Sequence, residues 1–140
     1  MGDQVLVIAY DFGMNTSGGF GQMIRVPSAW VIPKPSGLSA KDSMIIGTAG
    51  FTAALCVEKL LLNGLRADQG PVLVTGATGG VGIFAVALLK HLGFHVAAST
   101  GKASARDFLM GLGAAEIIDR NELSEETTKP MLKEQWAGAV

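Results

Sequence analysis

The stretch Val72-Leu73-Val74-Thr75-Gly76-Ala77-Thr78-Gly79-Gly80-Val81-Gly82 decides the fold of this 140-residue chain. It begins with three apolar residues and contains four glycines, and an apolar run from Ile83 to Lys90 follows without a break. A strand that enters a helix through such a turn can bring its backbone close to a ligand, because no Cβ blocks the approach. The first helical turn adds unpaired N–H groups and the positive end of the helix dipole. Together these features predict a pyrophosphate-binding loop.

The glycine loop satisfies two spacings at once. Gly76-x-x-Gly79-x-x-Gly82 is typical of medium-chain dehydrogenases, and Thr75-Gly76-x-x-x-Gly80-x-Gly82 is typical of short-chain ones. Short-chain enzymes begin with this strand and use a Tyr-x-x-x-Lys pair, whereas here 71 residues precede it and the sole tyrosine, Tyr10, is followed four positions later by Met14. Context therefore favours the medium-chain spacing. A Walker A loop is excluded because no Lys-Ser or Lys-Thr closes the run, and a glycine-rich turn without a ligand is the remaining alternative.

Strand and helix patterns alternate on either side of the loop. This alternation predicts an α/β fold with a parallel sheet and right-handed crossovers, that is, a partial doubly wound, Rossmann-type sheet. The expected strands are 72–75, 95–99, 116–118 and 137–140, and the expected helices follow the glycine loop as far as Gly93 and run from about 104 to 112.

The first 38 residues have a different texture, rich in strand and loop signals. We expect strands at 4–9 and 22–26, joined through a turn at 18–21, in what looks like part of a small barrel. From Ser39, an Ser-x-x-Asp start predicts a helix that ends at Asn63-Gly64. Within it, the small residues 47–50 indicate either close approach of another group or a break between two helices.

Composition excludes several classes of function. A net charge of −1 and a pI near 6.1 leave no basic surface for nucleic acid, so no nucleic-acid partner is expected. The single cysteine, Cys56, can form neither an internal disulfide nor a cysteine-based zinc site. We see no leader and no segment that approaches the length of a bilayer span, and therefore expect a cytoplasmic protein without a membrane partner.

The end of the second strand predicts which dinucleotide binds. NAD-specific sites place a carboxylate about twenty residues beyond the glycine loop, where it accepts hydrogen bonds from the ribose. This chain instead has Ser99-Thr100-Gly101-Lys102, with Arg106 a turn later. Hydroxyl and ammonium donors suit a phosphate dianion, which favours NADP(H) over NAD(H). A solvated loop with incidental charge is the alternative.

Arg120 follows the third expected strand, again at the carboxyl edge of the sheet. Its guanidinium could face the adenine or the 2′-phosphate of a bound nucleotide. A surface ion pair with Glu122 is the other interpretation.

These features together resemble a known family, the quinone oxidoreductase-like branch of the medium-chain dehydrogenase/reductase superfamily. The resemblance covers essentially the whole chain, and it is nearest to the subgroup that contains NADPH-dependent acryloyl-coenzyme A reductases. Besides the glycine loop, it rests on Gly2-Asp3-Gln4-Val5, Gly18-Gly19-Phe20, Val26-Pro27, Pro33-Lys34-Pro35-x-Gly37-Leu38-Ser39, Gly47-Thr48-Ala49-Gly50-Phe51-Thr52-Ala53-Ala54, Leu112-Gly113-Ala114 and Trp136-Ala137-Gly138-Ala139.

The resemblance implies an architecture. Residues 1–38 would be the C-terminal remnant of a GroES-like substrate domain, and residues 39–140 the N-terminal half of an NADP-binding Rossmann-type domain. The family branch is free of zinc, so no metal site is expected. The parent protein would be a homodimer.

The resemblance also implies a reaction and a binding site. An NADPH-dependent oxidoreductase of this type passes hydride to an activated double bond, as in acryloyl-CoA, or to a quinone. Catalytic residues are not identifiable in this sequence, and we expect the 140 residues alone to lack turnover. A nucleotide-binding module without redox chemistry is the alternative function. In this family the pyrophosphate would contact Thr78, Gly79, Gly80 and Val81, the 2′-phosphate Thr100, Gly101 and Lys102, and the cofactor also Arg120.

Overall fold

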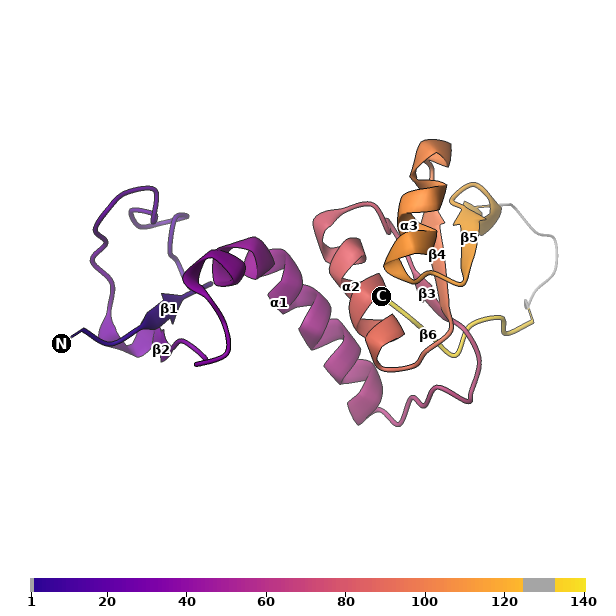
Figure 1. Ribbon diagram of the computed structural model, residues 1–140, viewed down its shortest axis with the longest axis horizontal. Helices are drawn as coiled ribbons and strands as arrows, with labels where there is room; N and C mark the ends of the chain where they lie inside the picture. Colours follow the sequence, from indigo (N-terminus) through magenta and orange to yellow (C-terminus); the bar gives the residue numbers. More distant parts are fainter. Residues whose placement is uncertain (1, 125–132) are drawn as a thin grey trace. The chain divides into compact units, whose positions relative to one another are not determined.

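The computed structural model describes residues 2–124 and 133–140, and the chain divides into two compact units, Met1–Thr48 and Ala49–Val140 (Figure 1). This division lies within a helix, whereas the sequence predicts a boundary before that helix. The strands are β1 (Val5–Val7), β2 (Val31–Pro33), β3 (Val72–Val74), β4 (Val96–Thr100), β5 (Glu116–Asp119) and β6 (Gly138–Ala139). The α-helices are α1 (Ala40–Leu62), α2 (Gly80–His91) and α3 (Arg106–Leu112), and short 3-10 helices span Ser28–Trp30, Ala103–Ala105 and Glu122–Ser124.

The first unit contains a two-stranded antiparallel sheet. Strand β1 pairs with β2, so that Val5 lies opposite Pro33. The expectation of a strand at 22–26 is wrong: the structure has no strand there, and β2 (Val31–Pro33) pairs with β1 instead. Pro33 is tolerated there because it ends an edge strand, where its missing N–H breaks no ladder. After β1 the chain turns through Ala9 and Tyr10, both with positive φ, and the Tyr10 ring stacks on Trp30 with centroids 5.1 Å apart.

Helix α1 begins as its sequence predicts and is interrupted inside. The Asp42 N–H donates to Ser39 Oγ at 3.0 Å, and this hydroxyl donates to Asp42 Oδ2 at 2.6 Å, which caps the first turn. Gly47 has φ 47° and ψ −154°, a conformation that an L side chain disfavours, and it breaks the helix into two parts. The interpretation of residues 47–50 as a break is therefore confirmed.

By length and composition α1 is apolar enough to cross a membrane, so the expectation that no segment approaches that length is wrong. In the structure, the part of α1 after the break contributes Gly50, Ala53 and Val57 to the interior of the second unit. These buried positions are typical of a core helix.

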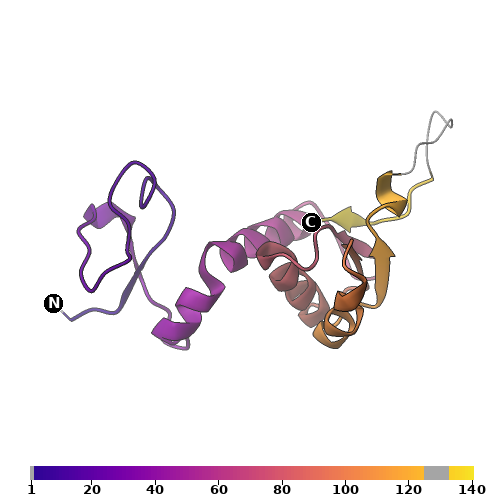
Figure 2. The ribbon, with the colours of Figure 1, turned by 90° about the horizontal axis from the view of Figure 1, so that it is seen from above.

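The second unit is a four-stranded parallel sheet with helices packed on it, as predicted. Its strand order is β5-β4-β3-β6 (Figures 1 and 2). Val72, Leu73 and Val74 of β3 lie opposite Val96, Ala97 and Ala98 of β4. The chain moves outward from β3 to β4 and β5 and then returns to the other side of β3 as β6. The strand order thus reverses between β3 and β6, which in doubly wound sheets is where a crevice opens at the carboxyl edge.

One hydrophobic core unites the helices with this sheet. Val72 and Val74 of β3, Leu89 of α2 and Leu109 of α3 are all fully buried in it. Their burial fixes α2 and α3 on the sheet, and so fixes the loops that join them to the carboxyl ends of β3 and β4. The packed core of β3, α2 and α3 therefore supports the predicted binding loop.

Candidate nucleotide-binding site

The glycine loop forms a tight turn between β3 and α2. Gly76 has a φ of +55°, which favours glycine, and its carbonyl accepts the Gly79 N–H at 2.8 Å. The Gly79 carbonyl then accepts the Ile83 N–H at 2.9 Å and so begins the helix. The Gly79 N–H is thus already bonded inside the loop. Gly79 could therefore help a ligand only because, without a side chain, it leaves room beside the backbone.

Close packing explains two further glycines of the loop. A Cβ built on Gly82 would lie 2.5 Å from the Gly76 carbonyl oxygen and 2.7 Å from Ala77 Cα, so the first turn of α2 rests directly on the turn. A Cβ on Gly80 would lie 3.1 Å from the Cβ of Ala49 in α1. The small residues 47–50 of α1 therefore also permit close approach, which is the other interpretation of that stretch.

Unpaired amides are present where a phosphate would bind. Within residues 2–124 and 133–140, no carbonyl or side chain accepts the N–H groups of Gly80, Val81 or Gly82. Gly80 is exposed and Val81 is half-buried, while Gly82 lies inside. Thr78, which precedes them, is also half-buried. The helix N-terminus is therefore open to an anion at Gly80 and Val81, two of the four residues predicted there.

The second predicted segment lies at the end of β4, directly beside the glycine loop. The Ala77 N–H donates to the Ser99 carbonyl at 3.0 Å and joins the two. Thr100 is only 7% exposed, and its hydroxyl accepts the Lys102 N–H at 3.1 Å. Thr100 thus shapes the turn from within, whereas Gly101 and the Lys102 side chain are exposed.

Arg120 completes the edge from the end of β5. Its N–H donates to the Thr100 carbonyl at 3.3 Å, and its side chain lies over Gly101, where a Cβ would come within 2.7 Å of Nε. Glu122 accepts the Asp119 N–H instead. Among the described residues the side chains of Arg120 and Lys102 make no ion pair or hydrogen bond, so the alternative pairing of Arg120 with Glu122 is not formed.

The structure therefore brings all three predicted segments to one edge. Each lies at the carboxyl end of a parallel strand, and main-chain hydrogen bonds join neighbouring segments. The edge combines helical N–H groups and two cations, all without a partner in the part of the chain that the structure describes, and glycines that leave room for a ligand. This arrangement can bind a phosphorylated nucleotide.

Thr75 is a residue of this edge that sequence reasoning missed. Its N–H and its hydroxyl both donate to the main-chain oxygen of Val140, at 2.8 and 3.1 Å. The available signal was a hydroxyl residue at the exit of β3, next to the strand expected at 137–140. The sequence does not show which strand pairs with which, so the contact could not be deduced.

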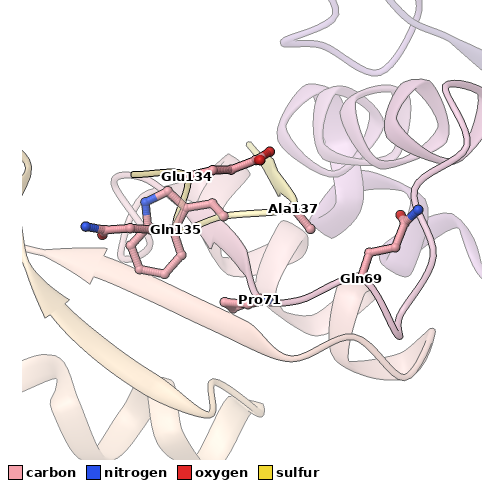
Figure 3. A pocket seen from close by; sticks show the side chains of 6 residues that line it. Gln69, Pro71, Glu134, Gln135 and Ala137 are labelled. Atoms are coloured by element: carbon pink, nitrogen blue, oxygen red, sulfur yellow. The ribbon is translucent and has the colours of Figure 1, made fainter. Parts of the chain in front are cut away.

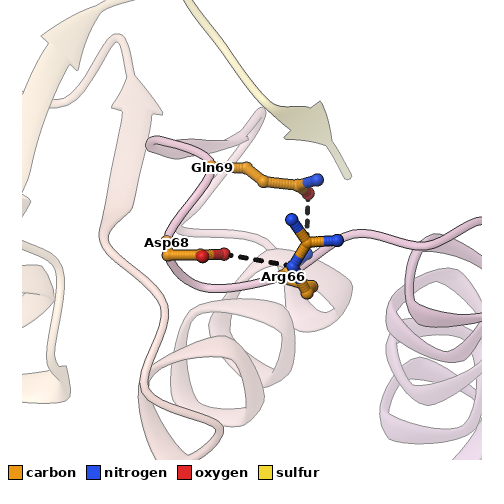
Figure 4. A network of polar contacts seen from close by, with 3 residues as sticks. All are labelled: Arg66, Asp68 and Gln69. Carbon is orange, nitrogen blue, oxygen red and sulfur yellow. Dashed lines mark hydrogen bonds and ion pairs between the residues drawn. The ribbon is translucent and has the colours of Figure 1, made fainter.

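Two hollows of the surface lie away from this edge. One, of about 400 Å³, lies at the amino-terminal ends of β3 and β6 (Figure 3), where Gln69 is also part of a polar turn (Figure 4). In that turn Arg66 Nε lies 3.3 Å from Asp68 Oδ1, and the Arg66 N–H donates to Gln69 Oε1 at 2.8 Å. A second, apolar hollow follows α1 beside Ala139. The first is lined by Gln69, Pro71, Glu134, Gln135, Trp136 and Ala137.

No group of three His, Cys, Asp or Glu side chains placed to hold a metal ion is found within the described residues. Cys56 is a free thiol on α1.

Known proteins resemble this chain over almost its whole length, although no family model matches it. YhfP of Bacillus subtilis is 49% identical and the acrylyl-CoA reductase AcuI of Ruegeria pomeroyi 46% identical, each over 139 residues, 99% of this chain. The YhdH oxidoreductase of Salmonella enterica in complex with NADP superposes with a TM-score of 0.94 at 48% identity. The chain belongs to the quinone oxidoreductase-like branch of the medium-chain dehydrogenase/reductase superfamily.

This membership confirms the resemblance and the α/β fold expected from the sequence. In each comparison 99% of this chain is aligned, and the aligned part spans 42% of the length of the relative. The structure of YhfP, which has NAD bound, also superposes with a TM-score of 0.94. Relatives of nearly the same similarity have thus been solved with different nicotinamide nucleotides.

Proposed function

We propose that this chain is the nucleotide-binding portion of an NADPH-dependent oxidoreductase that reduces an activated double bond, as in acryloyl-CoA, or a quinone. The observation that carries the proposal is the shared edge of β3, β4 and β5, where amides and two cations meet that have no partner within residues 2–124 and 133–140. A relative supports the reaction class, since AcuI of Ruegeria pomeroyi is an acrylyl-CoA reductase.

The residues fit a dinucleotide. The N–H groups of Gly80 and Val81 would hold the pyrophosphate, and Gly79 would let it approach the backbone. Lys102 and Arg120 would bind the 2′-phosphate and adenosine, while Thr100 and Gly101 would form the turn that presents them. Thr78 would border the pyrophosphate. When bound, the cofactor supplies a hydride, and this chain's contribution is to bind and orient the adenosine and diphosphate end.

The remaining features of the proposal concern the whole protein. Residues 1–38 would form part of a GroES-like substrate domain, and the enzyme would work without zinc as a homodimer in the cytoplasm. The 140 residues alone would bind the cofactor without turnover, because they span only 42% of the length of the relatives they match.

Two measurements test the proposal. Titration of the chain with NADPH and NADH, followed by nucleotide fluorescence, should give tighter binding of NADPH. The same chain mixed with NADPH and acryloyl-CoA or a quinone should oxidise no NADPH, and the full-length protein should oxidise it. A chain that binds neither nucleotide would overturn the proposal, and a full-length protein that binds NADPH but reduces no enoyl thioester, enone or quinone would favour a nucleotide-binding module without redox chemistry.

A further inference from the structure

Ala49 lies against the first residue of α2. It belongs to the part of α1 that follows the break at Gly47. A Cβ built on Gly80 would come within 3.1 Å of the Ala49 Cβ, which is closer than ordinary van der Waals contact. Both residues belong to the second unit. The missing side chain of Gly80 therefore leaves room for the methyl group of Ala49.

The start of α2 depends on packing because no side chain caps it. Gly79 occupies the N-cap position, and within residues 2–124 and 133–140 no side-chain hydrogen bond caps the helix. In the same part of the chain the N–H groups of Gly80 and Val81 have no acceptor. An uncapped first turn is easily displaced, because the hydrogen bonds of the helix do not hold these amides. The contact with Ala49 restrains this turn from outside the helix.

A fixed position of the free amides matters for a bound anion. Donors that already point at the binding position need no ordering when the ligand arrives, so more of the interaction energy appears as affinity. Ala49 is half-buried, and its methyl group fills the space beside Gly80. A larger side chain at position 49 would push Gly80 away, and a glycine there would leave a gap.

From this contact we propose that Ala49 is a positioning residue for the diphosphate of the bound nucleotide. Its methyl group packs against Gly80 and holds the two free amides of α2 toward the ligand. Position 80 is a glycine because Ala49 occupies the space of a side chain. This inference rests on the proposed function. Ala49 acts through Gly80 rather than by contact with the nucleotide.

The test is a double-mutant cycle on the full chain with two ligands. NADPH carries the diphosphate, whereas adenosine 2′-monophosphate carries the adenosine and the 2′-phosphate without it. Gly80→Ala adds a methyl group against Ala49 and should weaken NADPH binding about three- to ten-fold, as a displaced amide donor implies. Binding of adenosine 2′-monophosphate should stay within about two-fold, because it uses Lys102 and Arg120.

The second substitution exchanges the two side chains. In Gly80→Ala with Ala49→Gly the methyl group on position 80 fills the space that Ala49 leaves, so NADPH binding should return to within about two-fold of the unmodified chain. Ala49→Gly alone leaves the space empty and should weaken NADPH binding by at least about two-fold. Ala54→Gly, the same change at an exposed residue of α1, is the matched control and should leave NADPH binding unchanged.

Each outcome decides the inference. Unchanged NADPH binding by Gly80→Ala, an equal loss for both ligands, or a paired variant that does not recover overturns the positioning role. If Gly80→Ala does not fold, Ala49→Val is compared with Ala54→Val on both ligands, and a loss confined to NADPH in Ala49→Val is then expected. An unmodified chain that binds neither ligand overturns the proposed function itself, and that result is distinct from a cycle in which every variant binds NADPH alike.

Discussion

The guanidinium of Arg120 lies directly over Gly101. A Cβ on Gly101 would come within 2.7 Å of Nε and 2.8 Å of Cδ of Arg120, so only a glycine leaves this side chain where it lies. The contact joins the turn after β4 to the turn after β5. Gly101 therefore helps to position the guanidinium of Arg120.

Replacement of Gly101 by alanine should displace Arg120. The far end of an arginine can move, and Gly101 has no left-handed φ, so the free energy of unfolding should change by less than about 0.5 kcal/mol. NADPH affinity should fall about three- to ten-fold, since one charge-assisted contact is lost or lengthened. Isothermal titration calorimetry measures this, with Gly37→Ala, where a Cβ meets nothing within 4 Å, as the control. Unchanged affinity would remove Arg120 from the site.

Reversal of charge at Lys102 tests the preference for NADP(H). Lys102→Glu should weaken NADPH binding by about 1 to 3 kcal/mol, because a carboxylate would replace the donor facing the 2′-phosphate. NADH, which lacks that phosphate, should bind nearly as before. Fluorescence titrations of both nucleotides check the expectation. Lys41→Glu, an equal change of charge at an exposed residue of α1, serves as the control, and an equal effect there would mean that only net charge matters.

The packing of α2 against the glycine loop predicts a loss of stability on substitution. Gly82→Ala would place a methyl group 2.5 Å from the Gly76 oxygen, so helix or loop must move, at a cost of about 1 to 3 kcal/mol. Gly111→Ala in α3 meets nothing within 4 Å and should stabilise by about 0.5 to 1 kcal/mol through helix propensity. Urea unfolding followed by circular dichroism measures both changes. Equal signs for the two variants would contradict the packing account.

The core beneath the site predicts the cost of a cavity. Leu109 of α3 is fully buried, and Leu109→Ala should lower the free energy of unfolding by about 2 to 5 kcal/mol. Its neighbour Met110 is 42% exposed, and Met110→Ala should change stability far less. Thermal unfolding of the two variants separates them. A small effect at Leu109 would mean that α3 is not fastened to the sheet.

The sequence predicts the second unit well because its signals are local. Each parallel strand is an apolar run closed by a glycine or polar turn, and Gly93 and Gly113 both have positive φ where the helices end, as glycine at that position indicates. The Ser39 and Asp42 pair likewise predicts a cap that forms. Alternation then determines a parallel sheet.

Pairing between distant segments is what the sequence could not supply. The strand expected at 22–26 has the residues of a strand, yet β1 pairs with 31–33 instead. Thr100 has the hydroxyl that a phosphate prefers, but its burial directs that hydroxyl to the Lys102 amide. In both cases the outcome depends on which partner forms the hydrogen bonds, and the local sequence pattern does not show that partner.

Main-chain hydrogen bonds join neighbouring strands at the binding edge: Thr75 to Val140, Ala77 to Ser99, and Arg120 to Thr100. Main-chain hydrogen bonds do not depend on the identity of the neighbouring side chains. Protein engineers could therefore exchange the residues at positions 102 and 120 to alter nucleotide choice while the scaffold keeps its shape. Selectivity and foldability are, at this rim, separately adjustable properties.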